Sequence, residues 1–192
     1  MGNTQNFLQG ETTLETAKIP EENKLIASAI SKMACFSTQD MQNMEHDIEH
    51  FLKVWMFAKA IGESAHLDDK TQQTLELAGV VHDISCPLCR KKFGNASGKH
   101  QEEESEPLVR EFFSNFSEEG IDIDRIVHLV THHHTYTDID GIDYQILLEA
   151  DFLVNAEESS YSKEAIISAR DKFFRTELGL DLINNMLSKM AI

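Results

Sequence analysis

Apolar residues recur every three or four positions along most of the chain, as expected for helices that bury one face. Only three Pro and nine Gly interrupt this pattern, and no Pro follows Pro107. Long helices are therefore permitted almost everywhere, because Pro is the residue that most strongly breaks a helix interior. The pattern predicts an all-α fold, with helices at 21 to about 36, 39–60, 68–84, 100–116, 121–134, 144–158, 162–176 and 180–190.

Two stretches stand outside this helical pattern. The segment 85–99, SCPLCRKKFGNASGK, contains typical loop residues, and a shorter turn is expected at 135–141. The loop brings three cations together in an otherwise acidic chain, Arg90, Lys91 and Lys92. Residues 1–20 are polar, so we predict an N-terminal polar segment at 1–20 and one helical domain at 21–192.

The charge balance argues against nucleic acid as the partner. Asp and Glu number 33 against 17 Lys and Arg, which gives a formal net charge of −16 at pH 7. Such a protein repels phosphate backbones and anionic membrane surfaces. No apolar run approaches the length of a membrane span, and the first residues have no signal-peptide pattern. We expect a soluble cytoplasmic protein that neither binds nucleic acid nor enters a membrane.

The cysteines and the last helix each leave alternatives open. Cys86 and Cys89 have the spacing of a zinc half-site, but no second cysteine pair follows, so a structural zinc needs histidines from elsewhere. The last predicted helix is apolar enough either to close the core or to form the face of a homodimer. Its apolar residues are Leu180, Leu182, Ile183, Met186 and Leu187.

Nine histidines in 192 residues are the enrichment that points to chemistry. His82 and Asp83 are adjacent at the end of an apolar helix in LELAGVVHDI, where two neighbouring side chains can diverge from one buried face. Imidazole and carboxylate together are ligands suited to a hydrolytic divalent metal. Taken alone, the pair also fits a histidine near a helix C-terminus followed by a capping aspartate.

Three other segments add candidate ligands. His50 lies at the apolar boundary of its predicted helix, a position that a satisfied core histidine also takes. Four histidines fall within HLVTHHH, with His128 and His132 four residues apart on one helical face. Asp151 lies in a run that is apolar on most sides, where a carboxylate is costly to bury without a cation or donor. A partner for Asp151 is therefore implied.

Together these residues resemble the H…HD…D pattern of the HD-domain superfamily of metal-dependent phosphohydrolases. The similarity includes an apolar helix that ends in HD and a later ILLEAD-type helix with the last Asp, and the metal-site core is expected at about 47–156. The resemblance implies an all-α HD-like helical bundle that binds a divalent ion through His50, His82, Asp83 and Asp151.

Some members of that superfamily hold a second ion, with the Asp of the HD pair as the bridge. In this chain the bridge would be Asp83, and the candidate ligands of the second ion are His132 or His133 and His100. The helix that begins near His100 also offers Gln101, Glu102 and Glu104, and the sequence does not fix which of them faces the metal. These ligand types do not distinguish among manganese, iron, magnesium, nickel and zinc.

The activity implied by the resemblance is hydrolysis of a small phosphorylated or nucleotide substrate with the help of one or two divalent ions. The expected catalytic residues are His82, Asp83 and His133. The residues expected to contact substrate are Arg90, Lys91, Lys92, His134 and Tyr136. Two alternatives stay open: a cyclic-nucleotide or cyclic-dinucleotide phosphodiesterase, and a non-catalytic HD-fold module that binds metal or ligand for regulation.

Overall fold

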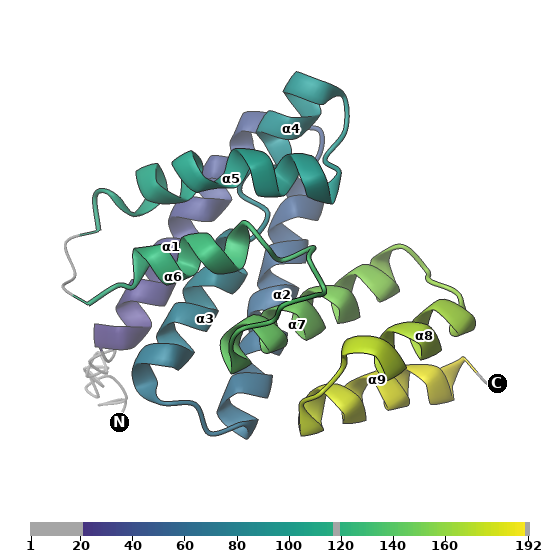
Figure 1. The fold of residues 1–192 in the computed structure, drawn as a ribbon. Coiled ribbons are helices and arrows are strands. Elements are labelled where there is room, and N and C mark those ends of the chain that lie inside the picture. Colours follow the sequence, from purple (N-terminus) through teal and green to yellow (C-terminus); the bar gives the residue numbers. More distant parts are fainter. Residues whose placement is uncertain (1–20, 117–119, 191–192) are drawn as a thin grey trace, which may run out of the picture.

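The computed structural model describes residues 21–116 and 120–190, and within these ranges it contains helices and no strand (Figure 1). The predicted all-α fold is confirmed, whereas the predicted polar segment 1–20 lies outside the described residues. No helix in these ranges combines the length and the apolar character needed to cross a bilayer. The elements are α1 (Glu21–Ser37), a 3-10 turn (Thr38–Asp40), α2 (Met44–Ser64), α3 (Asp69–Val81), α4 (Cys86–Phe93), α5 (Gly98–Phe113), α6 (Ile123–Val130), α7 (Ile142–Glu158), α8 (Lys163–Phe173) and α9 (Glu177–Lys189).

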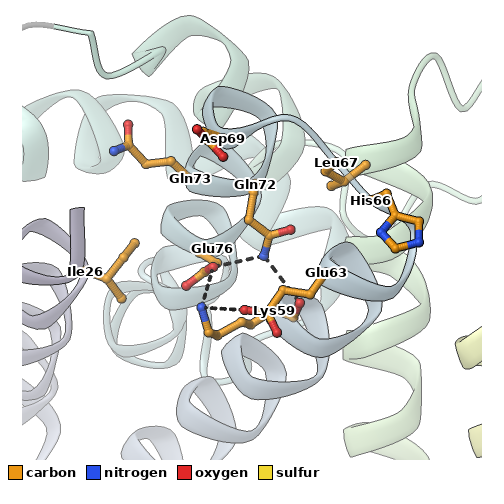
Figure 2. A pocket seen from close by; sticks show the side chains of 9 residues that line it. All are labelled: Ile26, Lys59, Glu63, His66, Leu67, Asp69, Gln72, Gln73 and Glu76. Carbon is orange, nitrogen blue, oxygen red and sulfur yellow. Dashed lines mark hydrogen bonds and ion pairs between the residues drawn. The ribbon is translucent and has the colours of Figure 1, made fainter. Parts of the chain in front are cut away.

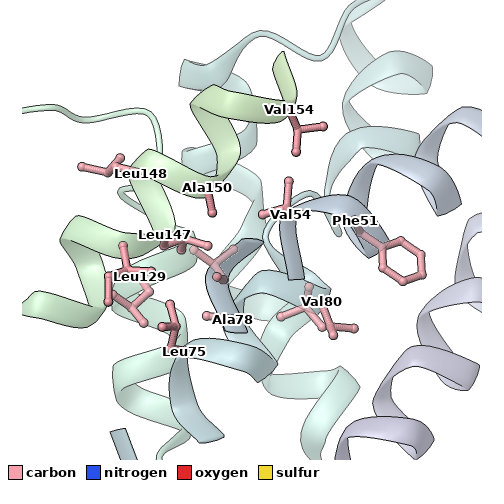
Figure 3. Packing of buried hydrophobic residues seen from close by; sticks show 14 of the residues in the cluster. Phe51, Val54, Leu75, Ala78, Val80, Leu129, Leu147, Leu148, Ala150 and Val154 are labelled. Carbon is pink, nitrogen blue, oxygen red and sulfur yellow. The ribbon is translucent and has the colours of Figure 1, made fainter. Parts of the chain in front are cut away.

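Helices α2, α3 and α7 pack against one another at the centre of one continuous hydrophobic core. Figure 3 shows Val54 of α2, Leu75 of α3 and Leu147 of α7 among the buried side chains that meet there. Helix α7 is buried on almost every side, which explains why its sequence is apolar on most sides. Four of its polar residues, Asp143, Gln145, Glu149 and Asp151, are therefore held inside the protein, where each needs a partner.

Helices α2 and α3 approach closely because α3 has a glycine at their crossing. A Cβ atom at Gly79 would lie 3.3 Å from the Cα of Trp55 in α2. The two helices run antiparallel, so this contact brings the first half of α2 beside the end of α3. The close approach therefore places His50 near His82 and Asp83.

Segment 85–99 differs from the sequence prediction, because the first part of the expected loop is the helix α4 (Cys86–Phe93). Pro87 lies in the first turn, where its missing N–H is no disadvantage. Cys86 and Cys89 form the buried face of this helix, and both thiols are free. The helix ends at Gly94, whose φ of 75° suits a left-handed C-cap. Two turns are too short for a periodic pattern to stand out from loop residues.

Two predicted helices also end earlier than expected. Helix α3 ends at Val81 and α6 ends at Val130, so the histidines that follow each helix lie in turns instead of in the last helical turn. The second of these helices was predicted to end near residue 134 because His128 and His132 are four residues apart. Their rings do lie on the same side of α6, with centroids 4.5 Å apart. The turns direct the following side chains away from the helix axes and toward the interior.

A buried carboxylate of α7 attaches the last two helices to the rest of the fold. Glu149 is fully buried and its Oε1 accepts hydrogen bonds from the backbone N–H of Arg175 at 2.6 Å and of Thr176 at 3.1 Å. Gln145 Nε2 donates to the same carboxylate at 2.7 Å. Helix α9 therefore begins at a fixed place beside α7, the helix that carries Asp151.

Candidate metal centre

Four of the predicted ligands converge between α2, α3 and α7. His50 belongs to α2, His82 and Asp83 to the turn after α3, and Asp151 to the middle of α7. Nε2 of His50 lies 3.2 Å from Nε2 of His82, 3.5 Å from an Asp83 oxygen and 3.4 Å from Oδ1 of Asp151. Nε2 of His82 lies 3.8 Å from Oδ2 of Asp83 and 3.6 Å from Oδ1 of Asp151.

These separations fit the coordination sphere of one divalent ion. Donor atoms about 2.1 Å from a common centre lie roughly 3.0 Å apart as neighbours in an octahedron and about 3.4 Å apart in a tetrahedron. The observed separations start at 3.2 Å and extend to 3.8 Å. Two imidazoles and two carboxylates also form a donor set that divalent transition metals accept.

Asp83 faces a second group of candidate ligands with its other oxygen. Its Oδ2 lies near His50 and His82, while its Oδ1 is 3.4 Å from Nε2 of His133. Ligand atoms of Asp83, His133 and His134 all lie within 4.8 Å of one another. The two groups therefore share Asp83, which is the arrangement that a bridging carboxylate needs.

Four buried polar atoms of this cluster have no hydrogen-bond partner. They are Asp83 Oδ1, His133 Nε2, His134 Nε2 and Asp151 Oδ2. An unsatisfied buried polar atom costs about 1–3 kcal/mol, so folded proteins rarely keep several in one place. A cation bound by Asp83, His133 and His134 would satisfy three of these atoms, and an ion held by Asp151 would satisfy the fourth, so the residues present fit divalent metal binding.

The ends of α3 and α6 orient two of the histidines in the same way. His82 Nδ1 donates to the carbonyl of Gly79 at 2.9 Å, and His133 Nδ1 donates to the carbonyl of Val130 at 2.6 Å. A carbonyl oxygen only accepts, so Nδ1 carries the hydrogen in both rings. These carbonyls belong to the last turns of α3 and α6, where no backbone N–H within the helix reaches them. In each ring Nε2 is left to face the cluster.

The protonation states around the centre follow from burial and from neighbouring charges. Burial opposes a charge on His50, but contact with Asp151 and the charge of Asp83 outweigh it and raise the pKa of His50 to about 10. Burial also opposes the ionised form of Asp83, yet the adjacent histidine rings hold its pKa well below the usual value. Burial and the charge of His133 lower the pKa of His134 to about 4. Asp83 is therefore ionised and His134 neutral near pH 7, the forms in which each can bind a metal, whereas His50 is protonated without an ion and must lose its Nε2 proton to become a ligand.

Helix α5 holds His134 in place. The Glu102 carboxylate accepts a hydrogen bond from the backbone N–H of His134 at 3.0 Å and from the hydroxyl of Thr135 at 3.1 Å. The His134 ring lies against Gly98, where a Cβ atom would be 2.6 Å from the ring. Of the polar residues that the sequence left open in this helix, Glu102 is thus the one that fixes the turn beside the cluster.

His100, in contrast, does not join either candidate group within the described part of the chain. Its ring stacks on Phe93 with centroids 4.0 Å apart, and its Nδ1 lies 3.3 Å from the side-chain oxygen of Asn95. These contacts attach His100 to the end of α4, a helix in a segment predicted to be a loop. The structure therefore gives no support to His100 as a ligand.

His132 also lies outside both candidate groups in the described residues. Its Nδ1 donates to the carbonyl of His128 at 2.8 Å, so its ring stays beside α6. The turn that begins after Val130 points the next two side chains into the cluster instead. For a second ion, the geometry favours His133, one of the two predicted alternatives, over His132, and brings His134 beside it where His100 was predicted.

Two of the three predicted phosphate-binding cations are engaged in ion pairs. Arg90 forms ion pairs with Asp40, at 2.7 Å, and with Asp47, so its guanidinium links α4 to the start of α2. Nζ of Lys92 lies 2.6 Å from a Glu104 oxygen. A substrate contact through Arg90 would require both carboxylates to be displaced, so the ion pairs of Arg90 argue against that predicted role.

Two further predicted substrate contacts, Lys91 and Tyr136, are more accessible. Lys91 is exposed on α4. Tyr136 keeps 40% of its surface exposed, and its ring lies 4.5 Å from that of Phe173. Their roles in binding substrate stay predictions.

A separate polar pocket of about 440 Å³ lies toward the other ends of α2 and α3 (Figure 2). Its main buried group, Glu76, accepts hydrogen bonds from Lys59, Gln72 and the indole of Trp55 at 2.9 to 3.1 Å. Lys59 also pairs with Glu63 at 3.0 Å. Because these charges satisfy one another, the pocket resembles a structural polar network more than a reactive site.

Comparison with known proteins agrees with this geometry. The sequence model of the HD domain family matches residues 47–175, about two thirds of the chain, and the chain belongs to that family. The match contains His50, the adjacent His82 and Asp83, and Asp151, and it confirms the resemblance to the superfamily of metal-dependent phosphohydrolases. No curated protein and no solved structure matches the chain.

Proposed function

We propose that this chain is a metal-dependent phosphohydrolase acting on a small phosphorylated or nucleotide substrate. The observation that carries the proposal is the buried cluster around Asp83, in which four polar atoms have no protein partner. Membership of the HD domain family also supports a metal-dependent phosphohydrolase. A bound divalent ion lowers the pKa of a water molecule and polarises a phosphoryl oxygen.

In this proposal the residues of the cluster have separate tasks. His50, His82, Asp83 and Asp151 hold the first ion. Asp83 is the most exposed of these ligands, with 24% of its side chain accessible, so the substrate phosphate approaches from its side. His133 and Asp83 bind a second ion, or a protonated His133 donates its Nε2–H to the substrate phosphate when one ion is present.

His134 is the predicted substrate contact that lies beside the metal centre. Its ring is neutral near pH 7 and its buried Nε2 has no protein partner, so it offers either a lone pair to an ion or a hydrogen to a phosphate oxygen. Lys91 and Tyr136 are proposed to complete the substrate contacts. These residues would recognise the phosphate group of the substrate.

Hydrolysis assays with a matched inactive variant test the proposal. Protein purified without chelator and supplied with Mn²⁺ is screened against a phosphomonoester, nucleoside mono-, di- and triphosphates, and cyclic mono- and dinucleotides. Turnover of the phosphomonoester or the nucleotides that Asp83→Ala abolishes is the expected result. Turnover of cyclic substrates alone would favour the phosphodiesterase, and metal binding without turnover of any substrate would favour the regulatory module.

A further inference from the structure

We propose that Glu158 is a positioning residue of the metal centre that fixes the His50 ring and strengthens its Nε2 as a ligand. This inference rests on the proposed metal site. Glu158 is the last residue of α7, and its Oε2 lies 2.8 Å from Nδ1 of His50. An ionised carboxylate only accepts hydrogen bonds, so Nδ1 carries the hydrogen and Nε2 is directed at the cluster.

His50 needs this carboxylate because it lies inside a helix. His82 and His133 follow helix ends and donate Nδ1–H to carbonyls of the last helical turn. In the interior of α2, the carbonyls of the preceding turn already accept backbone hydrogen bonds. The acceptor for His50 therefore comes from another helix, and it is charged where the other two are neutral.

Other contacts hold the Glu158 carboxylate in position. Nζ of Lys53 lies 2.9 Å from its Oε1, and Lys53 is three residues after His50, on the same side of α2. Nε2 of His46 is 3.4 Å from Oε2. Only 14% of the Glu158 side chain is exposed, so these contacts are partly shielded from solvent.

Glu158 and Asp151 are seven residues apart on α7, which places them two turns apart on nearly the same face. One helix therefore supplies both a ligand and the carboxylate that orients a ligand of another helix. A carboxylate behind a metal-bound imidazole fixes the ring and raises its basicity, and its loss typically weakens metal binding by about 10- to 100-fold.

Metal titrations of paired variants test the role of Glu158. Metal-free wild type, Glu158→Gln, Glu158→Ala and the control Glu157→Gln compete with a chromophoric chelator for Zn²⁺. Glu157 is the exposed neighbour of Glu158 and makes no contact with His50 in the hydrogen bonds and ion pairs described. We expect about tenfold weaker binding for Glu158→Gln, whose amide oxygen still accepts, and up to about 100-fold for Glu158→Ala. Glu157→Gln is expected to bind like wild type.

The imidazole ¹⁵N–¹H spectrum of the Zn²⁺-loaded protein gives a second readout that a purely structural role would not change. The Nδ1–H resonance of His50 is expected at low field in the wild type and at higher field in Glu158→Gln, while that of His82 stays in place. If the wild type binds no Zn²⁺, the metal site itself fails. If it binds and Glu158→Ala matches it, the metal site stands and the role of Glu158 is overturned. Should Glu158→Ala fail to fold, Glu158→Gln and these spectra decide.

Discussion

Removal of the metal is expected to lower the thermal stability of the protein by a measurable amount. Without an ion, four buried polar atoms of the cluster have no protein partner. At about 1–3 kcal/mol each, they represent an upper limit of roughly 4–12 kcal/mol that a bound ion could offset. An ion present at one hundred times its Kd contributes about 2.7 kcal/mol of that by mass action.

For a chain of 192 residues this contribution is large enough to resolve. In domains of this size, 1 kcal/mol shifts the Tm by about 2–4 °C, so chelation should lower the Tm by roughly 5–11 °C. The assay is thermal unfolding followed by circular dichroism, with Mn²⁺ in excess and then with EDTA. Asp83→Ala is the control, because it removes the ligand shared by both candidate groups and should not respond to either addition.

Two results would refute this reasoning. One is a wild-type Tm that is the same with Mn²⁺ and with EDTA, since the four atoms would then have partners other than a metal. The other is a metal-dependent shift of equal size in Asp83→Ala, which would place the stabilising ion away from the HD pair.

Three further predictions concern single positions. Where the wild type binds two equivalents of metal, Gly98→Ala should push the His134 ring aside and remove the second equivalent but not the first, and a variant that still binds two in a metal titration would contradict this. Glu149→Ala should lower the free energy of unfolding in urea by roughly 3–5 kcal/mol, because buried N–H groups at the start of α9 lose their acceptor; a loss below about 1 kcal/mol would contradict this. Lys91→Ala should raise KM for a phosphorylated substrate more than it lowers kcat, and an unchanged KM would assign Lys91 to solvent.

The sequence was sufficient to predict that His82, Asp83 and Asp151 converge, because these ligand-type residues lie in or at the end of clearly periodic helices. The pair His82 and Asp83 ends an apolar helix, and Asp151 is a carboxylate in a helix with little room for polar groups. A buried carboxylate requires a partner wherever it lies, so Asp151 indicated a cation before any contact was known. The helical period then predicted the elements that carry these residues.

The ends of the helices and the long-range partners could not be predicted in the same way. Whether His132 or its neighbours face the cluster depends on α6 ending at Val130, and a helix end is less well specified by period than a helix interior. Glu158 lies 108 residues from His50 in sequence, and its only local feature is its spacing from Asp151. The pairing of Arg90 with carboxylates near the start of α2 is likewise a product of tertiary packing.

The metal content of the purified chain tests the central claim most directly. Elemental analysis of wild type and of Asp83→Ala, both purified without chelator and then dialysed against excess Mn²⁺ and metal-free buffer, gives equivalents per chain. We predict one or two equivalents in the wild type and none in a folded Asp83→Ala. A wild type without metal, or an Asp83→Ala variant that keeps the full complement, would contradict the metal centre.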